Sequence, residues 1–242
     1  IRTIDQIIIK GYDKFPPSYL SYYAGIKKGK PFIQKKVIAQ NELLNNLGFV
    51  KTVKPPEALF RKDSTSVYFY LEKRNNNLFD GILGFATNED SQKLEFNGYL
   101  NLELNNNLNY GEQLLINYKA DGREQQNFRV RTTLPYLFKT PFGITAELKI
   151  FKQDSTFSTT DQQIRLNYQV NPTSSVYVGY KTYESSNLLD VIVAGSTVTD
   201  YDSRYLLTGA NYRRLQSDSF FPVKTYIGID SEIGTRSTAD TE

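Results

Sequence analysis

The sequence predicts a small α+β domain over residues 1–74, a short linker over residues 75–78 and part of a membrane β-barrel over residues 79–242. A change of pattern predicts this division. Before the linker, β-branched runs alternate with helical periodicity, whereas from Phe79–Thr87 onward alternating segments of strand length follow one another with almost no helical pattern. The aromatic content supports the second part, since 18 Tyr and 15 Phe suit the aromatic girdles of a barrel.

Composition narrows the function classes. The chain has no His and no Cys, which removes Cys nucleophiles, Ser-His triads and His/Cys metal sites. We therefore expect neither an enzyme nor a bound cofactor. The net charge of +3 is small and gives no support for nucleic-acid binding. No run approaches the roughly 20 apolar residues of a spanning helix. The chain starts at Ile1 rather than Met, so we expect a processed or trimmed piece of a longer protein.

The first domain begins with one strand and two helices. Ile4–Lys10 is a β-branched run closed by Gly11, which predicts a strand. Pro16 and Pro17 open a short helix that runs to about Ala24, since Pro is tolerated near a helix start. The strongest helical pattern spans Ile33–Leu47, where apolar side chains fall on one face.

Two further strands complete this domain. Phe49–Val53 and Ser66–Lys73 have strand character, and Arg61–Thr65 is the turn into the second of them. The element order is therefore β-α-α-β-β. Three strands covered on one face by two helices make a small two-layer core.

Beyond the linker the pattern predicts about nine strands, each with one apolar face and one face of charges or amides. A soluble antiparallel sandwich also alternates, so alternation alone leaves both folds open. Strand length favours the membrane barrel, because the segments run to about 9–13 residues and soluble strands peak at about 5–6. Aromatic residues also gather at the strand ends: Tyr110, Tyr136, Phe138, Phe142, Phe220 and Phe221 at one set of turns, and Phe151, Phe157, Tyr180 and Tyr183 near the other.

Turn lengths predict the orientation in the membrane. The longest connection, Ser185–Ser203, follows the seventh strand, and longer loops of outer-membrane barrels face outward. A domain that enters the first strand from the periplasm predicts the same orientation. The short turns after the even-numbered strands are therefore expected on the periplasmic side: Asn105–Asn109, Pro135–Pro141, Asn171–Ser174 and Asp218–Pro222.

The first domain resembles a POTRA domain. The resemblance lies in an opening strand that ends in Gly, a G-x-x-F sequence before the second helix and an L-x-x-x-G-F sequence at its end. These are Ile7–Gly11, Gly29–Phe32 and Leu44–Phe49 in this chain. Tyr12 stands where the family most often has Asn.

The strands resemble the outer-membrane assembly barrels typified by BamA and TamA. Phe79–Thr87 is similar to their Gly-rich first strand, Asn107–Gly111 to their second turn, and Leu134–Phe138 to their P-Y turn. The resemblance implies sixteen strands, of which this chain supplies about nine. We therefore expect the chain to be incomplete at both ends, since an open sheet in lipid leaves backbone groups unpaired.

The resemblance implies a bacterial outer-membrane location with the POTRA domain in the periplasm, and a role in assembling and inserting outer-membrane proteins. Unfolded clients would add a strand to the POTRA edge at Phe49, Val50, Lys51, Thr52 and Val53. They would then insert through a lateral seam at Phe79, Gly81, Leu83, Gly84, Phe85 and Thr87, where the glycines weaken packing. Implied partners are these clients, periplasmic or lipoprotein subunits and membrane lipid, but no nucleic acid.

Two other functions stay open. A two-partner secretion pore has the same architecture and exports one dedicated client through the lumen. An outer-membrane enzyme would depend on carboxylates alone, with Glu95, Glu103 and Glu147 on the inward face, although solvated inward charges are ordinary in barrels.

Overall fold

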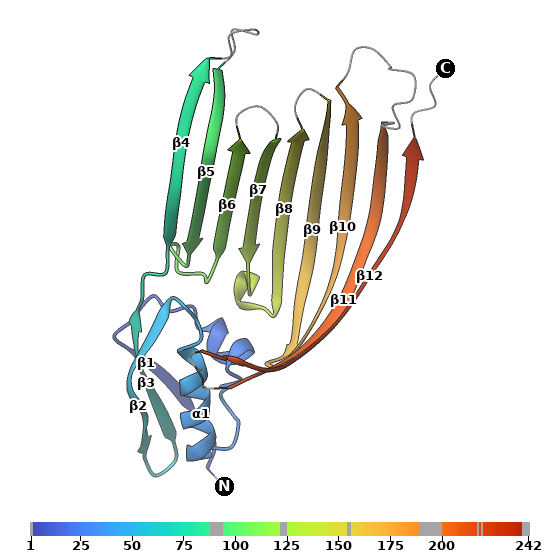
Figure 1. Cartoon of the computed structure of the whole chain (residues 1–242). Helices are drawn as coiled ribbons and strands as arrows, with labels where there is room; N and C mark the ends of the chain where they lie inside the picture. Colours follow the sequence, from blue (N-terminus) through green and yellow to red (C-terminus); the bar gives the residue numbers. More distant parts are fainter. Residues whose placement is uncertain are drawn as a thin grey trace.

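The chain forms a small α+β domain joined to one large antiparallel sheet, as a computed structural model shows (Figure 1). No described helix is long and apolar enough to cross a membrane. The structure describes residues 2–87, 94–121, 125–153, 156–188, 200–216, 218 and 220–238, without the side chains of Ala86 and Leu94–Phe96.

The first domain has the predicted β-α-α-β-β order. Its elements are β1 (Gln6–Lys10), η1 (Tyr19–Tyr23, a π-helical turn), α1 (Gln34–Leu44), β2 (Val50–Phe60) and β3 (Thr65–Lys73). The sheet order is β1-β3-β2, with β1 parallel and β2 antiparallel to the central strand. Val67, Phe69 and Leu71 of β3 are fully buried beneath the helices, which places the domain core on one face of the sheet.

Strand β2 is longer than the sequence predicted. It continues past Val53 through Pro55 and Pro56 to Phe60, with register shifts on both sides of Lys54. Two prolines argue against a strand interior because they donate no backbone hydrogen bond. An edge strand tolerates them, and β2 has no neighbour beyond β3 in the described sheet. Helix α1 is shorter than predicted and ends at Leu44, where residues 45–47 continue as turns.

The second part is a sheet of nine strands, as predicted. Each strand pairs antiparallel with the next in sequence. The strands are β4 (Leu78–Thr87), β5 (Leu94–Asn105), β6 (Gln113–Asp121), β7 (Gln125–Leu134), β8 (Phe142–Gln153), β9 (Phe157–Asn171), β10 (Ser174–Asn187), β11 (Tyr201–Leu215) and β12 (Val223–Thr238). Strands β4 and β12 form its two edges and do not pair with each other, so the sheet is open (Figure 1).

The two faces of this sheet differ in character. One face carries the charges and amides, including the ion pairs between Glu147 and its neighbours on β7. The other carries aliphatic and aromatic side chains that stay exposed, such as Ile164 at 52% and Leu206 at 56%. A soluble sandwich would cover this apolar face with a second sheet. Within the described residues no second layer does so.

The strands extend further than predicted at the largest connection. Ser185 lies in β10 and Ser203 in β11, and each is buried within the paired strands. The connection is therefore residues 188–200 rather than Ser185–Ser203. Tyr180 was expected near a strand end, but it lies midway along β10, opposite Ile164 and Leu206.

Candidate functional site: the interdomain junction and two strand edges

The short turns of the sheet meet the first domain, as Figure 1 shows. Hydrogen bonds connect three of these turns to the first domain, and a close approach connects the fourth. Tyr12 Oη donates to Asn109 Oδ1 (2.7 Å), Tyr22 Oη to the Lys139 carbonyl (3.3 Å) and Asn46 Nδ2 to the Gln216 carbonyl (2.9 Å), while Gly25 lies against the Pro172 ring. The four short turns, which follow β5, β7, β9 and β11, therefore lie on the side of the first domain, as the turn lengths predicted.

An aromatic cluster forms the centre of this junction. Tyr136, in the turn after β7, packs edge-on against Tyr19 with ring centroids 4.9 Å apart and lies 5.4 Å from the Tyr22 ring. Tyr19 donates its hydroxyl to the Gly111 carbonyl at 3.0 Å. A side chain at Gly111 would overlap the Tyr19 ring, so only glycine permits this approach. Tyr136 was predicted to be a girdle residue, but it is an interdomain contact.

The turn after β5 binds the Tyr12 hydroxyl through hydrogen bonds. Asn106 is fully buried at φ +54°, accepts the Gly111 N–H (2.8 Å) and donates to Tyr12 Oη (2.8 Å). The Glu112 carboxylate accepts the backbone N–H groups of Leu108 (2.6 Å) and Tyr110 (3.0 Å). Burial raises the pKa values of Tyr12 and Tyr19 above the ordinary tyrosine value. Both phenols therefore stay neutral donors at physiological pH.

The predicted seam strand is the edge strand β4. Phe79 and Phe85 are about three-quarters exposed, at 75% and 76%, and Leu83 is half exposed. A Cβ at Gly81 would lie 2.8 Å from the Tyr99 carbonyl oxygen, so this glycine lets β4 and β5 approach closely. At Gly84 it would meet only the flexible side chain of Asn97. Thr87 is exposed at the end of the strand.

The stronger backbone requirement in this hairpin lies on β5. Gly98 has φ +113°, and a Cβ there would overlap the Ile82 carbonyl oxygen. Since non-glycine residues rarely adopt this conformation, only glycine lets β5 approach β4 this closely at position 98. Sequence reasoning missed it, because nothing in the alternation distinguishes it from the other glycines.

The predicted client-binding edge lies on β2, the free edge of the three-stranded sheet. Phe49 and Val50 are buried, whereas Lys51 and Val53 are exposed and Thr52 is half-buried. The N–H of Val50 donates to the Leu47 carbonyl (2.9 Å) and the N–H of Thr52 to Asn45 Oδ1 (2.8 Å). Both of these donors are therefore already used inside the domain.

The polar face of the large sheet centres on Glu147. Its carboxylate is almost fully buried and contacts Arg129 (2.8 Å), Arg131 (2.6 Å), Lys149 (3.3 Å) and Gln163 Nε2 (2.9 Å). The cations satisfy this carboxylate, which leaves it no evident catalytic role. Glu103 pairs with Asn105. The Glu95 side chain lies outside the described residues.

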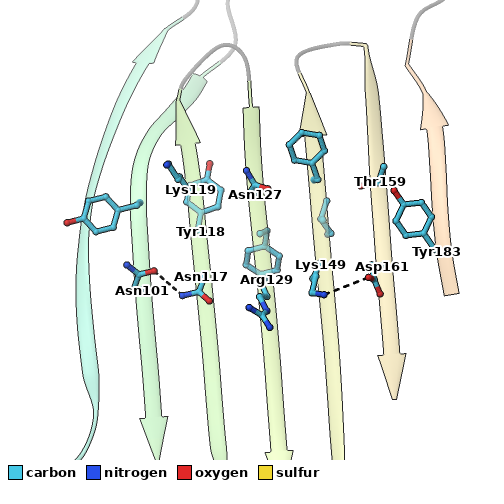
Figure 2. A pocket seen from close by; sticks show the side chains of 14 residues that line it. Asn101, Asn117, Tyr118, Lys119, Asn127, Arg129, Lys149, Thr159, Asp161 and Tyr183 are labelled. Atoms are coloured by element: carbon cyan, nitrogen blue, oxygen red, sulfur yellow. Dashed lines mark hydrogen bonds and ion pairs between the residues drawn. The ribbon is translucent and has the colours of Figure 1, made fainter. Parts of the chain in front are cut away.

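A hollow of about 650 Å³ lies on this face (Figure 2). Asn117 donates to Asn101 (2.9 Å) and Lys149 lies 3.8 Å from Asp161 across its floor. Its lining combines amides, phenols and paired charges with the apolar side chains of Phe128, Ile150 and Phe151. Within the described residues no cluster of acidic side chains has the arrangement of a metal site.

Comparison with known proteins agrees with this architecture. Residues 2–74 match the POTRA family, described as a surface antigen variable number repeat. The first domain is a POTRA domain. The whole chain superposes on BamA from Haemophilus ducreyi lacking POTRA domains 1–3, with TM-score 0.58, 18% identity and 97% of this chain covered. CdiB from Acinetobacter baumannii gives TM-score 0.59 at 16% identity over 98%, and CdiB from Escherichia coli 0.51 at 15% over 92%.

The predicted fold is thus confirmed: a domain that matches the POTRA family is followed by antiparallel strands that superpose on those of BamA and CdiB. The chain spans 48%, 46% and 46% of these three solved chains, about half their length. No curated protein matches the sequence.

Proposed function

We propose that this protein resides in the bacterial outer membrane, with its POTRA domain in the periplasm, and that it assembles and inserts outer-membrane proteins. The observation that carries this proposal is the free edge of β4, which combines exposed apolar side chains with glycines at Gly81 and Gly84. In lipid, each unpaired backbone group costs several kcal/mol. Weak pairing of this strand with the final strand of the intact barrel would let an incoming client strand pair with β4 instead.

Three features support the membrane setting. The apolar face of the sheet is exposed, the opposite face is polar, and the strands are 9 to 16 residues long, which is enough to cross a bilayer at barrel tilt. The POTRA domain lies against the short turns, the end of the sheet that faces the periplasm in such barrels. Phe138 and Phe220 at these turns, 94% and 89% exposed, suit the interfacial girdle.

We propose no covalent chemistry. Client binding would use main-chain hydrogen bonds, which provide affinity without demanding a particular sequence. Partners would be unfolded outer-membrane proteins, periplasmic or lipoprotein subunits and the surrounding lipid.

A reconstitution experiment tests this function. The intact protein is placed in liposomes and given a urea-unfolded outer-membrane barrel as client, and folding is followed by resistance to SDS at room temperature. We expect faster insertion than in empty liposomes. A disulfide that joins β4 to the final strand of the intact barrel should block the acceleration, and reduction should restore it. Equal insertion with the locked seam would contradict the seam mechanism.

A second candidate is a two-partner secretion pore, which the fold similarity to CdiB favours equally. The same liposomes discriminate the two. An insertase leaves its client embedded in the bilayer, whereas a secretion pore moves a dedicated client across it. Protease access to the client from each side of the membrane separates these results.

A further inference from the structure

The apolar face of the large sheet has a depression across β7, β8, β9 and β10. Thr132 and Ala146 face each other across β7 and β8, and Ala146 faces Ile164 on β9. Because two small side chains stand beside larger neighbours, the surface is hollowed there. The depression has a volume of about 550 Å³, and its lining includes Val130, Thr132, Ala146, Leu148, Ile164 and Tyr180. Glu147 and Gln163, whose side chains lie on the polar face, complete the lining.

A row of polar side chains borders the depression on the side away from the POTRA domain. Strand pairing places Gln162 of β9 opposite Thr182 of β10, and Thr182 opposite Arg204 of β11. Gln162 and Thr182 line the depression directly. Each residue of this polar row stands two positions from a residue of the apolar face, so the row lies on that face as well. The three apolar residues are Ile164, Tyr180 and Leu206.

The polar row is available to a ligand. Within the described residues, the side chains of Gln162 and Thr182 form no hydrogen bond with the protein. Arg204 has an ion pair with Asp202 at 3.8 Å, and the two side chains are 68% and 49% exposed. An amide, a hydroxyl and a guanidinium can all donate hydrogen bonds to a phosphate oxygen. Since neighbouring strands are about 4.8 Å apart, the long Gln162 and Arg204 side chains can converge on one group beside Thr182.

Two carboxylates form the next row outward. Glu184 of β10 faces Asp202 of β11, two positions beyond Thr182 and Arg204. This places the carboxylates about 7 Å further along the strands than the polar row. A zwitterionic phospholipid has the complementary order, because its phosphate lies next to the acyl chains and its ammonium group extends beyond the phosphate.

The position of the depression favours membrane lipid as its occupant. It opens on the apolar face, where Ile164 is 52% and Tyr180 46% exposed. Lipid tails are as apolar as these side chains, so general contact with lipid gives little preference for one lipid molecule. Such a preference has to come from close packing in the depression and from hydrogen bonds to the head group. Because the depression and the polar row adjoin, one lipid can use both.

We propose that this part of the sheet binds one zwitterionic phospholipid of the outward-facing leaflet. An acyl chain packs in the depression over Ala146. Gln162, Thr182 and Arg204 bind the phosphate, and Glu184 and Asp202 face the ammonium group. The site lies on β7 to β11, away from the edge strands β4 and β12, so it is separate from the proposed client seam. This inference rests on the proposed membrane location but not on the insertase activity.

Native mass spectrometry of the intact protein in detergent tests this proposal. The probes are dioleoyl phosphatidylethanolamine, dioleoyl phosphatidylglycerol and dioleoylglycerol, added separately at equal concentration. Retention of one phosphatidylethanolamine should exceed that of dioleoylglycerol, which lacks the phosphate, about fivefold, and that of phosphatidylglycerol, which lacks the ammonium group, about threefold. Excess inorganic phosphate should not displace the lipid. Equal retention of the three lipids, or displacement by phosphate, would overturn the proposal.

One pair of variants locates the acyl chain. Ala146→Phe fills the depression and should lower the retention of phosphatidylethanolamine about fivefold. The control Ala210→Phe adds the same ring to the apolar face of β11, opposite Val176 and outside the depression, and should lower retention less than about twofold. Resistance to SDS at room temperature shows that each variant is folded. Equal losses from the two folded variants would refute the site.

A second pair of tests addresses the head group and leaves the depression unfilled. Arg204→Gln should lower the retention of phosphatidylethanolamine about threefold, and Gln162→Leu with Thr182→Val should do the same. The control Lys152→Gln removes an exposed cation of β8 outside the polar row and should leave retention unchanged. Retention that survives both sets of substitutions, or that falls equally in Lys152→Gln, would refute binding of the phosphate by the polar row.

This proposal and the insertase function fail separately. Client insertion that proceeds in liposomes while the protein does not distinguish the three lipids would overturn this inference and leave the insertase function standing. Selective lipid retention without any acceleration of insertion would do the reverse.

Discussion

Replacement of Tyr136 by Asn should weaken the docking of the POTRA domain on the sheet. Tyr136 makes two ring contacts with the POTRA domain, with Tyr19 at 4.9 Å and Tyr22 at 5.4 Å. Each aromatic pair contributes about 0.5–1.5 kcal/mol, so the loss of both should weaken docking by about 1–3 kcal/mol, or roughly five- to 150-fold in the docking equilibrium. Asn is chosen because Tyr136 has φ +52°, a conformation that Asn tolerates.

The same turn offers a matched control. Phe138 also has φ +52°, but it is 94% exposed. Phe138→Asn should therefore leave docking unchanged. The readout is the distance distribution between spin labels at Lys62→Cys and Lys152→Cys, which are exposed positions in a chain without native cysteine. Tyr136→Asn should broaden the distribution. A distribution as narrow as that of the unsubstituted protein, or equal broadening by Phe138→Asn, would refute this account of the junction.

Three further outcomes are expected. Burial raises the pKa of Tyr19, so the stability it provides is complete below the ordinary tyrosine pKa of about 10 and is lost as the pH rises through the raised pKa. Unfolding scans should show a loss of stability at high pH, and Tyr19→Phe should make this loss smaller without abolishing it, because burial also raises the pKa values of Tyr12 and Tyr136. Gly98→Ala should disorder the β4–β5 hairpin through overlap with the Ile82 carbonyl, seen as faster amide exchange in β4, whereas exchange in β10 should not change. Glu147→Gln should lower the free energy of unfolding of the sheet by about 1–3 kcal/mol in detergent melts. This loss is smaller than for a fully buried ion pair because the cations around Glu147 are partly solvated. The control Asp202→Asn, which removes an exposed ion pair of 3.8 Å, should leave the free energy of unfolding almost unchanged.

Periodicity predicted the elements of this chain well, because each strand has to separate an apolar face from a polar one. Nine strands follow the linker, and the four short turns lie at the POTRA end. The Pro55-Pro56 pair obscured the distal half of β2, since edge-strand status depends on the spatial order β1-β3-β2 and not on local sequence.

The junction was beyond sequence reasoning for a different reason. The sequence pattern predicts a girdle residue for any aromatic residue at a strand end, whether its side chain contacts lipid or protein. Tyr136 and Phe138 are two positions apart in one turn, yet the first packs on the POTRA domain and the second is exposed. Only the docking of the two domains separates these environments. The same holds for Asn106 and Gly111, whose roles depend on Tyr12 and Tyr19, more than 90 positions away.

The most direct test of the central claim is site-specific cross-linking from β4 to a client during insertion. Photoreactive residues are placed singly at Phe79, Ile82 and Leu83 on the free edge strand and, as a control, at Val178 within the sheet. The seam account predicts cross-links from β4 to one terminal strand of the client, appearing before the client becomes resistant to SDS, and none from Val178. Client folding without any cross-link from β4, or equal yields from Val178, would contradict it.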